Sequence, residues 1–82
     1  MYPRVRDVKP DSDYTIVITF DNNEIRRFDV KPYLSTGIFK QLQDITEFNS
    51  VRPVLGSVQW NGGQDFCPDM LYKESILIKE ES

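Results

Sequence analysis

Two aspartates around a proline come nearest to a chemical site in this sequence. Asp65 and Asp69 lie four residues apart, on either side of Cys67 and Pro68. With a bound divalent metal, two such carboxylates could support the activation of water for a hydrolysis. The simpler interpretation assigns Asp65 to a turn and Asp69 to the positive end of a helix that begins at Pro68. A metal-dependent hydrolase is therefore the least favoured of the functions that we consider.

Histidine is absent from the sequence, and there is a single cysteine. The absence of histidine removes the most common general base, the most common zinc ligand and every Ser-His or Cys-His nucleophile pair. Cys67 precedes the expected helix, whose dipole favours a thiolate, but without a base we expect a small, partly buried side chain. A lone cysteine cannot form an internal disulfide, which favours a reducing cytoplasm. We predict a protein that is not an enzyme, with no catalytic, metal-binding or cofactor-binding residues.

Two further patterns suggest ligands but have simpler explanations. Asp11 and Asp13 could bind calcium, but a calcium loop needs a spaced glycine and a distal glutamate, so we expect a turn. The pair Gly62 and Gly63 could hold a phosphate, but no longer glycine fingerprint and no Lys-Ser or Lys-Thr follows it. We interpret this pair as a tight turn.

The composition is that of a small soluble domain. The chain has 82 residues, 39% of them hydrophobic and 28% charged, which suits a single domain spanning residues 1–82. No apolar run approaches the ~18–20 residues of a membrane span, and the N-terminus has no apolar signal core. A net charge of −3 gives no general attraction to nucleic acid. We therefore expect a cytoplasmic protein that does not bind membranes.

The clearest secondary-structure pattern is a hairpin. Residues 14–20 alternate between apolar and polar side chains, and residues 24–30 form the returning strand. A two-residue loop would place a carboxylate on the apolar face, whereas a three-residue loop pairs Ile16 with Phe28 and keeps that face apolar. The three-residue loop needs a left-handed residue at its third position, a conformation that Asn23 tolerates.

The same register defines an outer face of the hairpin, directed away from the core. Val17, Ile25 and Arg27 lie on it among threonine and aspartate side chains. Aliphatic residues beside an arginine are a common composition for the centre of an interface, although scattered exposed apolar residues are also normal. We regard Val17, Ile25 and Arg27 as candidate contact residues for a protein partner or a second copy of the chain.

The remaining patterns predict short elements. In chain order we expect an edge strand within residues 1–10, a helix over residues 37–43, a short turn over residues 44–49, strands over residues 51–55 and 57–60, a helix over residues 68–74, and a last edge strand after residue 75 that frays from about residue 79. Ile38, Phe39 and Leu42 should face the core. The fold class is therefore α+β, a small antiparallel sheet with a central hairpin and two to three short helices packed around Trp60.

Taken as a whole, the chain resembles a bacterial family known as domain of unknown function 2442. The resemblance includes the hairpin, with Asn23 where the family usually has glycine, and it is most specific in a C-terminal motif made of Trp60, Gly62 or Gly63, Asp65, Pro68, Asp69, Leu71 and Tyr72. It implies a small α+β domain without an established activity. Some such domains are encoded beside another small protein, as toxin–antitoxin pairs are, and others are joined to a helix-turn-helix DNA-binding domain.

Three functions follow, in order of preference. The first is a non-enzymatic protein–protein interaction module, which could be half of a toxin–antitoxin-like pair. The second is a nucleic-acid-binding accessory or regulatory domain, which would need the arginines to share one face. The hairpin register opposes this, because it places Arg26 and Arg27 on opposite faces. The third is the metal-dependent hydrolase that would use Asp65 and Asp69.

Overall fold

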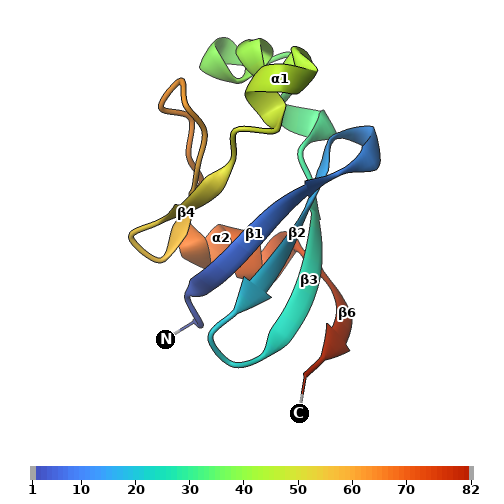
Figure 1. Ribbon diagram of the computed structural model, residues 1–82, viewed down its shortest axis with the longest axis vertical. Coiled ribbons are helices and arrows are strands. Elements are labelled where there is room, and N and C mark those ends of the chain that lie inside the picture. Colours follow the sequence, from blue (N-terminus) through green and yellow to red (C-terminus); the bar gives the residue numbers. More distant parts are fainter. Residues whose placement is uncertain (1, 82) are drawn as a thin grey trace.

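A four-stranded antiparallel sheet is the largest element of the structure, with the strand order β1-β2-β3-β6 (Figure 1). The computed structural model describes residues 2–81. The four strands are β1 (Val5–Asp11), β2 (Thr15–Phe20), β3 (Glu24–Asp29) and β6 (Ile76–Glu80). The hairpin of β2 and β3 occupies the two central positions, and the α+β class predicted from the sequence is confirmed.

The register of this hairpin is the one that a three-residue loop predicts. Ile16 lies opposite Phe28, and the N–H of Val30 donates a 3.0 Å hydrogen bond to the carbonyl of Tyr14. Asn23 has a φ of 72°, in the left-handed region that the third position of such a loop requires. Ile16, Ile18 and Phe20 of β2 therefore point to the face that becomes the core.

The first edge of the sheet, β1, is well protected. It contains Pro10, and its register with β2 shifts between Val5 and Asp7. In addition, the N–H of Val5 donates a 2.9 Å hydrogen bond to the carbonyl of Gly56, so a neighbouring hairpin lies against this strand. Prolines, bulges and covering segments all hinder the pairing of an edge with another chain.

The second edge, β6, lies beside β3 and has less protection. Its register shifts between Ile25 and Arg26 of β3, and it contains no proline. The strand extends to Glu80, and the N–H of Glu81 donates a 2.8 Å hydrogen bond to the carbonyl of Asn23. Pairing therefore continues beyond residue 79, where we expected the tail to fray.

The other elements are short. They are the 3₁₀ helices η1 (Ser12–Tyr14), η2 (Lys31–Tyr33) and η3 (Gly37–Gln43), the α-helices α1 (Ile45–Phe48) and α2 (Pro68–Glu74), and the strands β4 (Arg52–Val54) and β5 (Ser57–Gln59), which form a separate two-stranded sheet. In η3, Leu42 is buried and Phe39 packs against the core, but Ile38 is exposed, so its predicted core position is wrong. A 3₁₀ helix has three residues per turn, which aligns Phe39 with Leu42 and turns Ile38 away.

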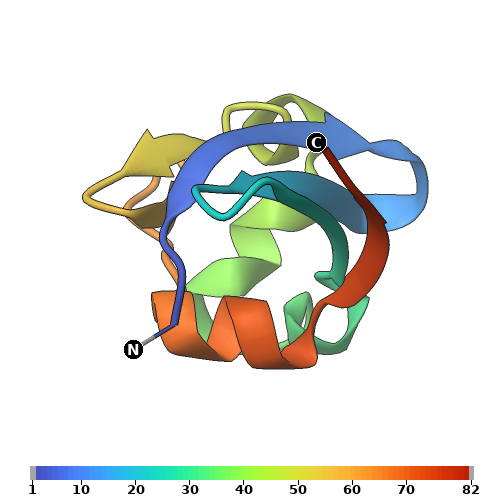
Figure 2. The ribbon, with the colours of Figure 1, turned by 90° about the horizontal axis from the view of Figure 1, so that it is seen from below.

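The core lies between the sheet and the helices. Figure 2 shows the sheet curving around the helical segments, with α2 across its open side. Trp60 is fully buried, and its indole N–H donates a 2.8 Å hydrogen bond to the carbonyl of Phe48. Leu71 is also fully buried, and the ring of Tyr72 meets that of Phe20 edge-on at 5.2 Å. Trp60, around which the helices were expected to pack, therefore lies in the core, and Leu71 and Tyr72 of the C-terminal motif lie in it or against it.

The left-handed turn position gives a first testable prediction. Replacing Asn23 by glycine should leave the free energy of unfolding unchanged or raise it, because glycine adopts a positive φ without a Cβ penalty. Replacing Asn23 by valine should lower it by about 1–2 kcal/mol. Urea unfolding followed by Trp60 fluorescence measures both. A valine variant as stable as the wild type would contradict this account of the turn.

Candidate protein-interaction surface

The outer face of the hairpin has the composition that the sequence predicts. Val17 lies directly opposite Arg27, and Thr19 lies opposite Ile25. The side chains of Val17 and Ile25 are half-buried and that of Arg27 is exposed, whereas Ile16 and its inward neighbours have no exposed surface. The three candidate contact residues therefore share one surface, which lies outside the core.

The neighbouring strands enlarge this surface. Lys9 of β1 lies opposite Val17, and on the other side Ile76 and Lys79 of β6 lie opposite Arg27 and Ile25. Residues opposed in a sheet point to the same face. One cross-strand row is thus Lys9, Val17, Arg27 and Ile76. We call these four residues, with Ile25 and Lys79, the outer surface. The sequence analysis missed Ile76 because nothing local showed that β6 would lie beside β3.

Ion pairs on this side of the sheet are exposed and weak. Arg27 is 3.1 Å from Asp11, and Lys31 is 3.1 Å from Asp29. The Asp29 carboxylate, assisted by Asp13, raises the pKa of Lys31. Pairs this exposed contribute little to stability because water screens them. Their side chains can therefore exchange these contacts for those of a partner at small cost.

The inner side of β3 contains a denser polar network, centred on Arg26. Its guanidinium donates to the hydroxyl and carbonyl of Ser75 at 2.8 and 2.9 Å and to Glu24 at 2.7 Å. It also lies 4.4 Å from the centre of the Tyr72 ring, and the Tyr72 hydroxyl donates to Glu24 at 3.0 Å. These contacts join β3 to the end of α2, and so they place the start of β6 beside β3.

Glu24 is more acidic than usual because of this network. Burial alone would raise its pKa, but the hydrogen bonds from Arg26 and Tyr72 and the charge of Arg26 outweigh burial, so the pKa lies below the ordinary value of 4.5. The hydrogen bond that the Tyr72 hydroxyl donates to Glu24 also raises the pKa of Tyr72. The ionised carboxylate therefore stabilises the fold.

The arginines do not converge on one face. Arg26 and Arg27 point to opposite faces of β3, as the register predicted. The other three bind polar groups on separate loops: Arg4 donates to the Leu55 carbonyl, Arg6 to the Asn23 side chain and Arg52 to the Asn61 side chain. This arrangement gives no continuous basic path for a nucleic-acid backbone.

The residues of the C-terminal motif have mostly structural positions. Pro68 is at the start of α2, and Asp69 is exposed in its first turn. Asp65 is exposed and forms an isolated bridge with Gln59. Gly63 has a φ of 91°, and a Cβ on Gly62 would come within 2.7 Å of the Gln64 side chain. Within residues 2–81, no three His, Cys, Asp or Glu side chains gather as metal ligands.

The burial of two residues in the same segment, Cys67 and Gln64, differs from what the sequence predicts. Cys67 is exposed, so the prediction of partial burial is wrong; it precedes α2, and Phe66 beside it turns inward instead. Gln64 was not predicted to be buried, yet it is fully buried and donates a 2.8 Å hydrogen bond to the carbonyl of Ile38. A glutamine gives no sequence signal for such burial, because its partner is 26 residues away.

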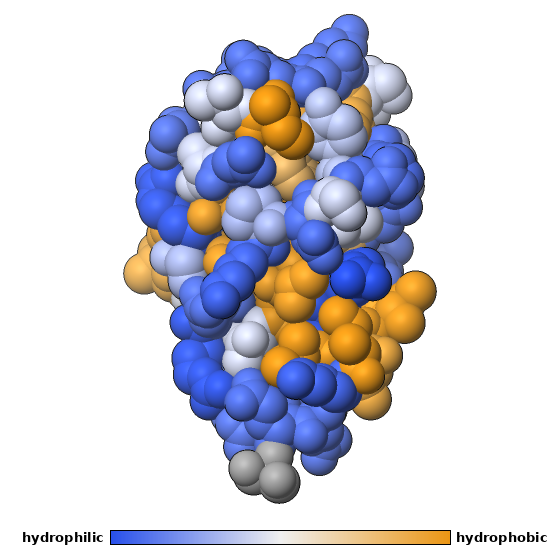
Figure 3. All heavy atoms as spheres, turned by 45° about the vertical axis from the view of Figure 1, so that its right-hand side comes forward, coloured by the Kyte–Doolittle hydropathy of each residue, from blue (hydrophilic) through white to orange (hydrophobic). Residues whose placement is uncertain are grey.

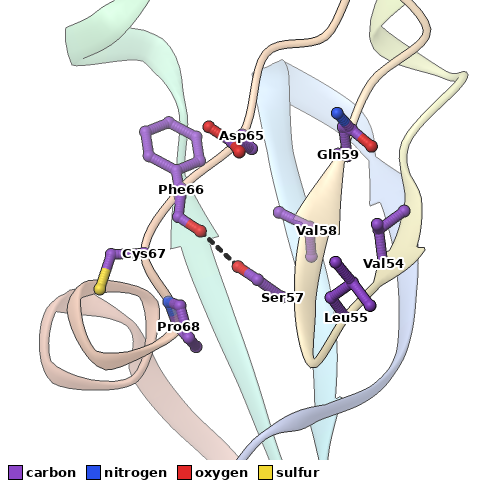
Figure 4. Close-up of a pocket in the computed structure, with 9 residues that line it drawn as sticks. All are labelled: Val54, Leu55, Ser57, Val58, Gln59, Asp65, Phe66, Cys67 and Pro68. Carbon is purple, nitrogen blue, oxygen red and sulfur yellow. Dashed lines mark hydrogen bonds between the residues drawn. The ribbon is translucent and has the colours of Figure 1, made fainter.

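A cleft of about 500 Å³ lies between the β4–β5 hairpin and the loop that leads to α2 (Figure 4). Asp65, Cys67 and Ser57 are among its lining residues. The Ser57 hydroxyl donates to the carbonyl of Phe66 and so joins β5 to the loop. This hydroxyl therefore has a structural role, and the sequence has no histidine to form a Ser-His or Cys-His nucleophile pair with it or with the Cys67 thiol.

Comparison with known proteins identifies the family. A family model described as "Protein of unknown function (DUF2442)" matches residues 5–76, so the chain belongs to this family. No curated protein and no solved structure matches it. No helix within residues 2–81 is long and apolar enough to cross a membrane.

The lowered pKa of Glu24 gives a pH-dependent prediction. A carboxylate with a depressed pKa in the folded state adds stability above its unfolded pKa, and this stability is lost as the pH falls through the folded pKa. Glu24→Gln should therefore be less stable than the wild type at pH 7, with a difference that shrinks as the pH falls below about 4.5. Urea unfolding at several pH values measures this difference. A difference that stays constant with pH would contradict the role assigned to the ionised carboxylate.

The hairpin beside the cleft gives a third prediction. Its two-residue loop is Leu55 and Gly56, with φ values of 51° and 81°, and the Leu55 side chain is 89% exposed. Asparagine tolerates this left-handed conformation far better than leucine. Leu55→Asn should therefore raise the free energy of unfolding by about 1 kcal/mol, measured by urea unfolding, with the exposed Ile45→Asn in helix α1 as a control that should not be stabilised.

Proposed function

For this member of the DUF2442 family we propose a non-enzymatic function: it is a protein–protein interaction module that binds a protein partner through its outer surface. The observation that carries the proposal is the opposition of Val17 and Arg27, with Ile25 and Ile76 beside them, on a face that does not contribute to the core. An arginine can pack its stem on aliphatic neighbours and bind a carboxylate of the partner with its guanidinium.

The chemistry of this surface indicates the kind of partner. Its charged members Lys9, Arg27 and Lys79 are positive although the whole chain is acidic. One carboxylate, Asp7, lies in the same cross-strand row as Ile25 and Lys79, so cations still outnumber carboxylates in these rows. Lys9 and Lys79 form no salt bridge within residues 2–81. A partner that presents carboxylates around an apolar centre would match this arrangement. In its finer form the proposal makes the chain half of a toxin–antitoxin-like pair.

Nucleic acid is a weaker alternative. The three cations are separated by aliphatic side chains, and the remaining arginines are bound to other segments. Affinity for a phosphate backbone depends on several cations along one path. These observations favour a protein partner.

Variants of the outer surface test the proposal. The tagged full-length chain is expressed in its native cell, and proteins that co-purify with it are quantified by mass spectrometry. Val17→Lys and Arg27→Glu should each reduce recovery of the partner by about tenfold or more, because both change the centre of the interface. Both variants should keep the circular dichroism spectrum of the wild type, because these side chains lie outside the core.

Matched controls make the result specific. Ile45→Lys in α1 and Lys40→Glu in η3 make the same kinds of change at exposed positions outside the sheet, and they should recover the partner as the wild type does. If folded Val17→Lys and Arg27→Glu proteins retain every partner, the outer surface is ordinary protein surface. For the finer proposal, the captured partner or this chain should slow growth when expressed alone, and co-expression should restore it.

A further inference from the structure

The strand β6 exposes aliphatic side chains on both of its sides. The exposed fractions of Ile76, Leu77 and Ile78 are 74%, 48% and 46%. Ile76 and Leu77 lie opposite Arg27 and Arg26, which point to opposite faces of β3, so exposure of both means that the domain covers neither face at the start of β6. Figure 3, which brings this side of the molecule forward, shows a group of apolar side chains among polar ones. The core of the domain does not explain why this strand is aliphatic.

The free edge of β6 is also open to backbone pairing. Within residues 2–81 it pairs with β3 alone, whereas the edge at β1 is shielded by Pro10 and the β4–β5 hairpin. Of the usual protective devices, β6 has a register shift and the charged Lys79 and Glu80, and all of them lie after its first two residues. An exposed aliphatic edge is a template for another strand.

We propose that a second copy of this chain binds here, with its β6 antiparallel to the first, around a two-fold axis perpendicular to the sheet. The two sheets then join into one of eight strands. Ile76 and Lys79 lie opposite Arg27 and Ile25, so both point to the outer face. The register shift leaves Ile78 as an extra residue, which is why Ile76 and Lys79 share a face although they are three residues apart. Pairing Ile76 with Lys79 of the second copy therefore keeps the two outer faces on the same side, and it opposes Leu77 to Ile78 near the axis.

This register is complementary in charge and in apolar contact. Glu80 lies opposite Glu24 and so points to the inner side. In the pair, Glu80 of the second copy comes opposite Ser75, whose hydroxyl and carbonyl hold the Arg26 guanidinium. A second carboxylate is favourable beside this cation, and the stem of Lys79 can cover the exposed Ile76.

A second copy fits this edge better than an unrelated strand does. A strand that pairs with this edge needs aliphatic side chains opposite Leu77 and Ile78 and a carboxylate opposite Ser75. A second β6 supplies both, with Glu80 as the carboxylate. A two-fold pairing meets each requirement twice, as an isologous interface does. The inference is independent of the partner proposed for the outer surface. A dimer formed in this way presents two outer surfaces on one side of a continuous sheet.

Sedimentation velocity of the purified full-length chain tests the proposal, from low micromolar to near-millimolar concentration. We expect a monomer–dimer equilibrium, since the apolar strip is smaller than a standard stable interface. Ile78→Lys should raise the dimer dissociation constant about tenfold or more, because it places two lysines beside the axis. Ile45→Lys, the same change at an exposed site in α1, should leave the constant unchanged. A chain that stays monomeric at every concentration would overturn the proposal.

Disulfide trapping tests the pairing without a charged substitution. In a Cys67→Ser background, an equal mixture of Ile76→Cys and Lys79→Cys proteins should form a crosslinked heterodimer, because opposed residues of antiparallel strands have Cα atoms at disulfide distance. Neither protein alone should crosslink to the same extent. A dimer that is lost in Val17→Lys but kept in Ile78→Lys would show self-association through the outer surface and overturn the edge pairing. If the edge dimer forms but Val17→Lys and Arg27→Glu retain every partner, only the proposed function fails.

Discussion

The register of the β2–β3 hairpin is the constraint from which the rest of the structure follows. A shift by one residue would turn every side chain of both strands to the other face. With the three-residue loop that ends at Asn23, Ile16 and Phe28 point into the core, and Val17 and Arg27 point outward. The same pairing thus builds the apolar centre and leaves a mixed aliphatic and basic surface on its reverse side.

The Arg26 network extends this constraint to the C-terminal part of the chain. Its guanidinium binds Glu24 on its own strand and Ser75 at the end of α2, and it lies over the Tyr72 ring. Since β6 begins directly after Ser75, this network determines where the last strand starts. An ion pair with little exposed surface is weak support for stability in general, but here it specifies one arrangement of three elements.

The two edges of the sheet differ in how well their unpaired backbone groups are covered. Unpaired backbone groups on an edge attract other strands. The β4–β5 hairpin covers β1, and the carbonyl of Gly56 in its loop accepts a hydrogen bond from the N–H of Val5. The edge of β6 is uncovered and aliphatic. The outer surface and this edge meet at Ile76, so one small domain can present a face to a different protein and an edge to its own copy.

The sequence by itself determined the features that depend on neighbouring residues. Alternation and loop length predicted the register and the left-handed Asn23, and Pro68 predicted the start of α2, because these depend on local backbone geometry. The burial of residues in the short elements was less predictable: Ile38 turned outward because its segment is a 3₁₀ helix, and Cys67 is exposed. The same local rules placed Val17, Ile25 and Arg27 on one face.

Only the tertiary structure decided which segments meet. The position of β6 beside β3, the burial of Gln64 against the carbonyl of Ile38, and the covering of β1 by the hairpin all join residues that are far apart in the chain. No local pattern specifies such contacts, because a strand with a given alternation can pair with any free edge. From the sequence, Ile76 was therefore expected only within a terminal edge strand, and the fold places it on the outer surface.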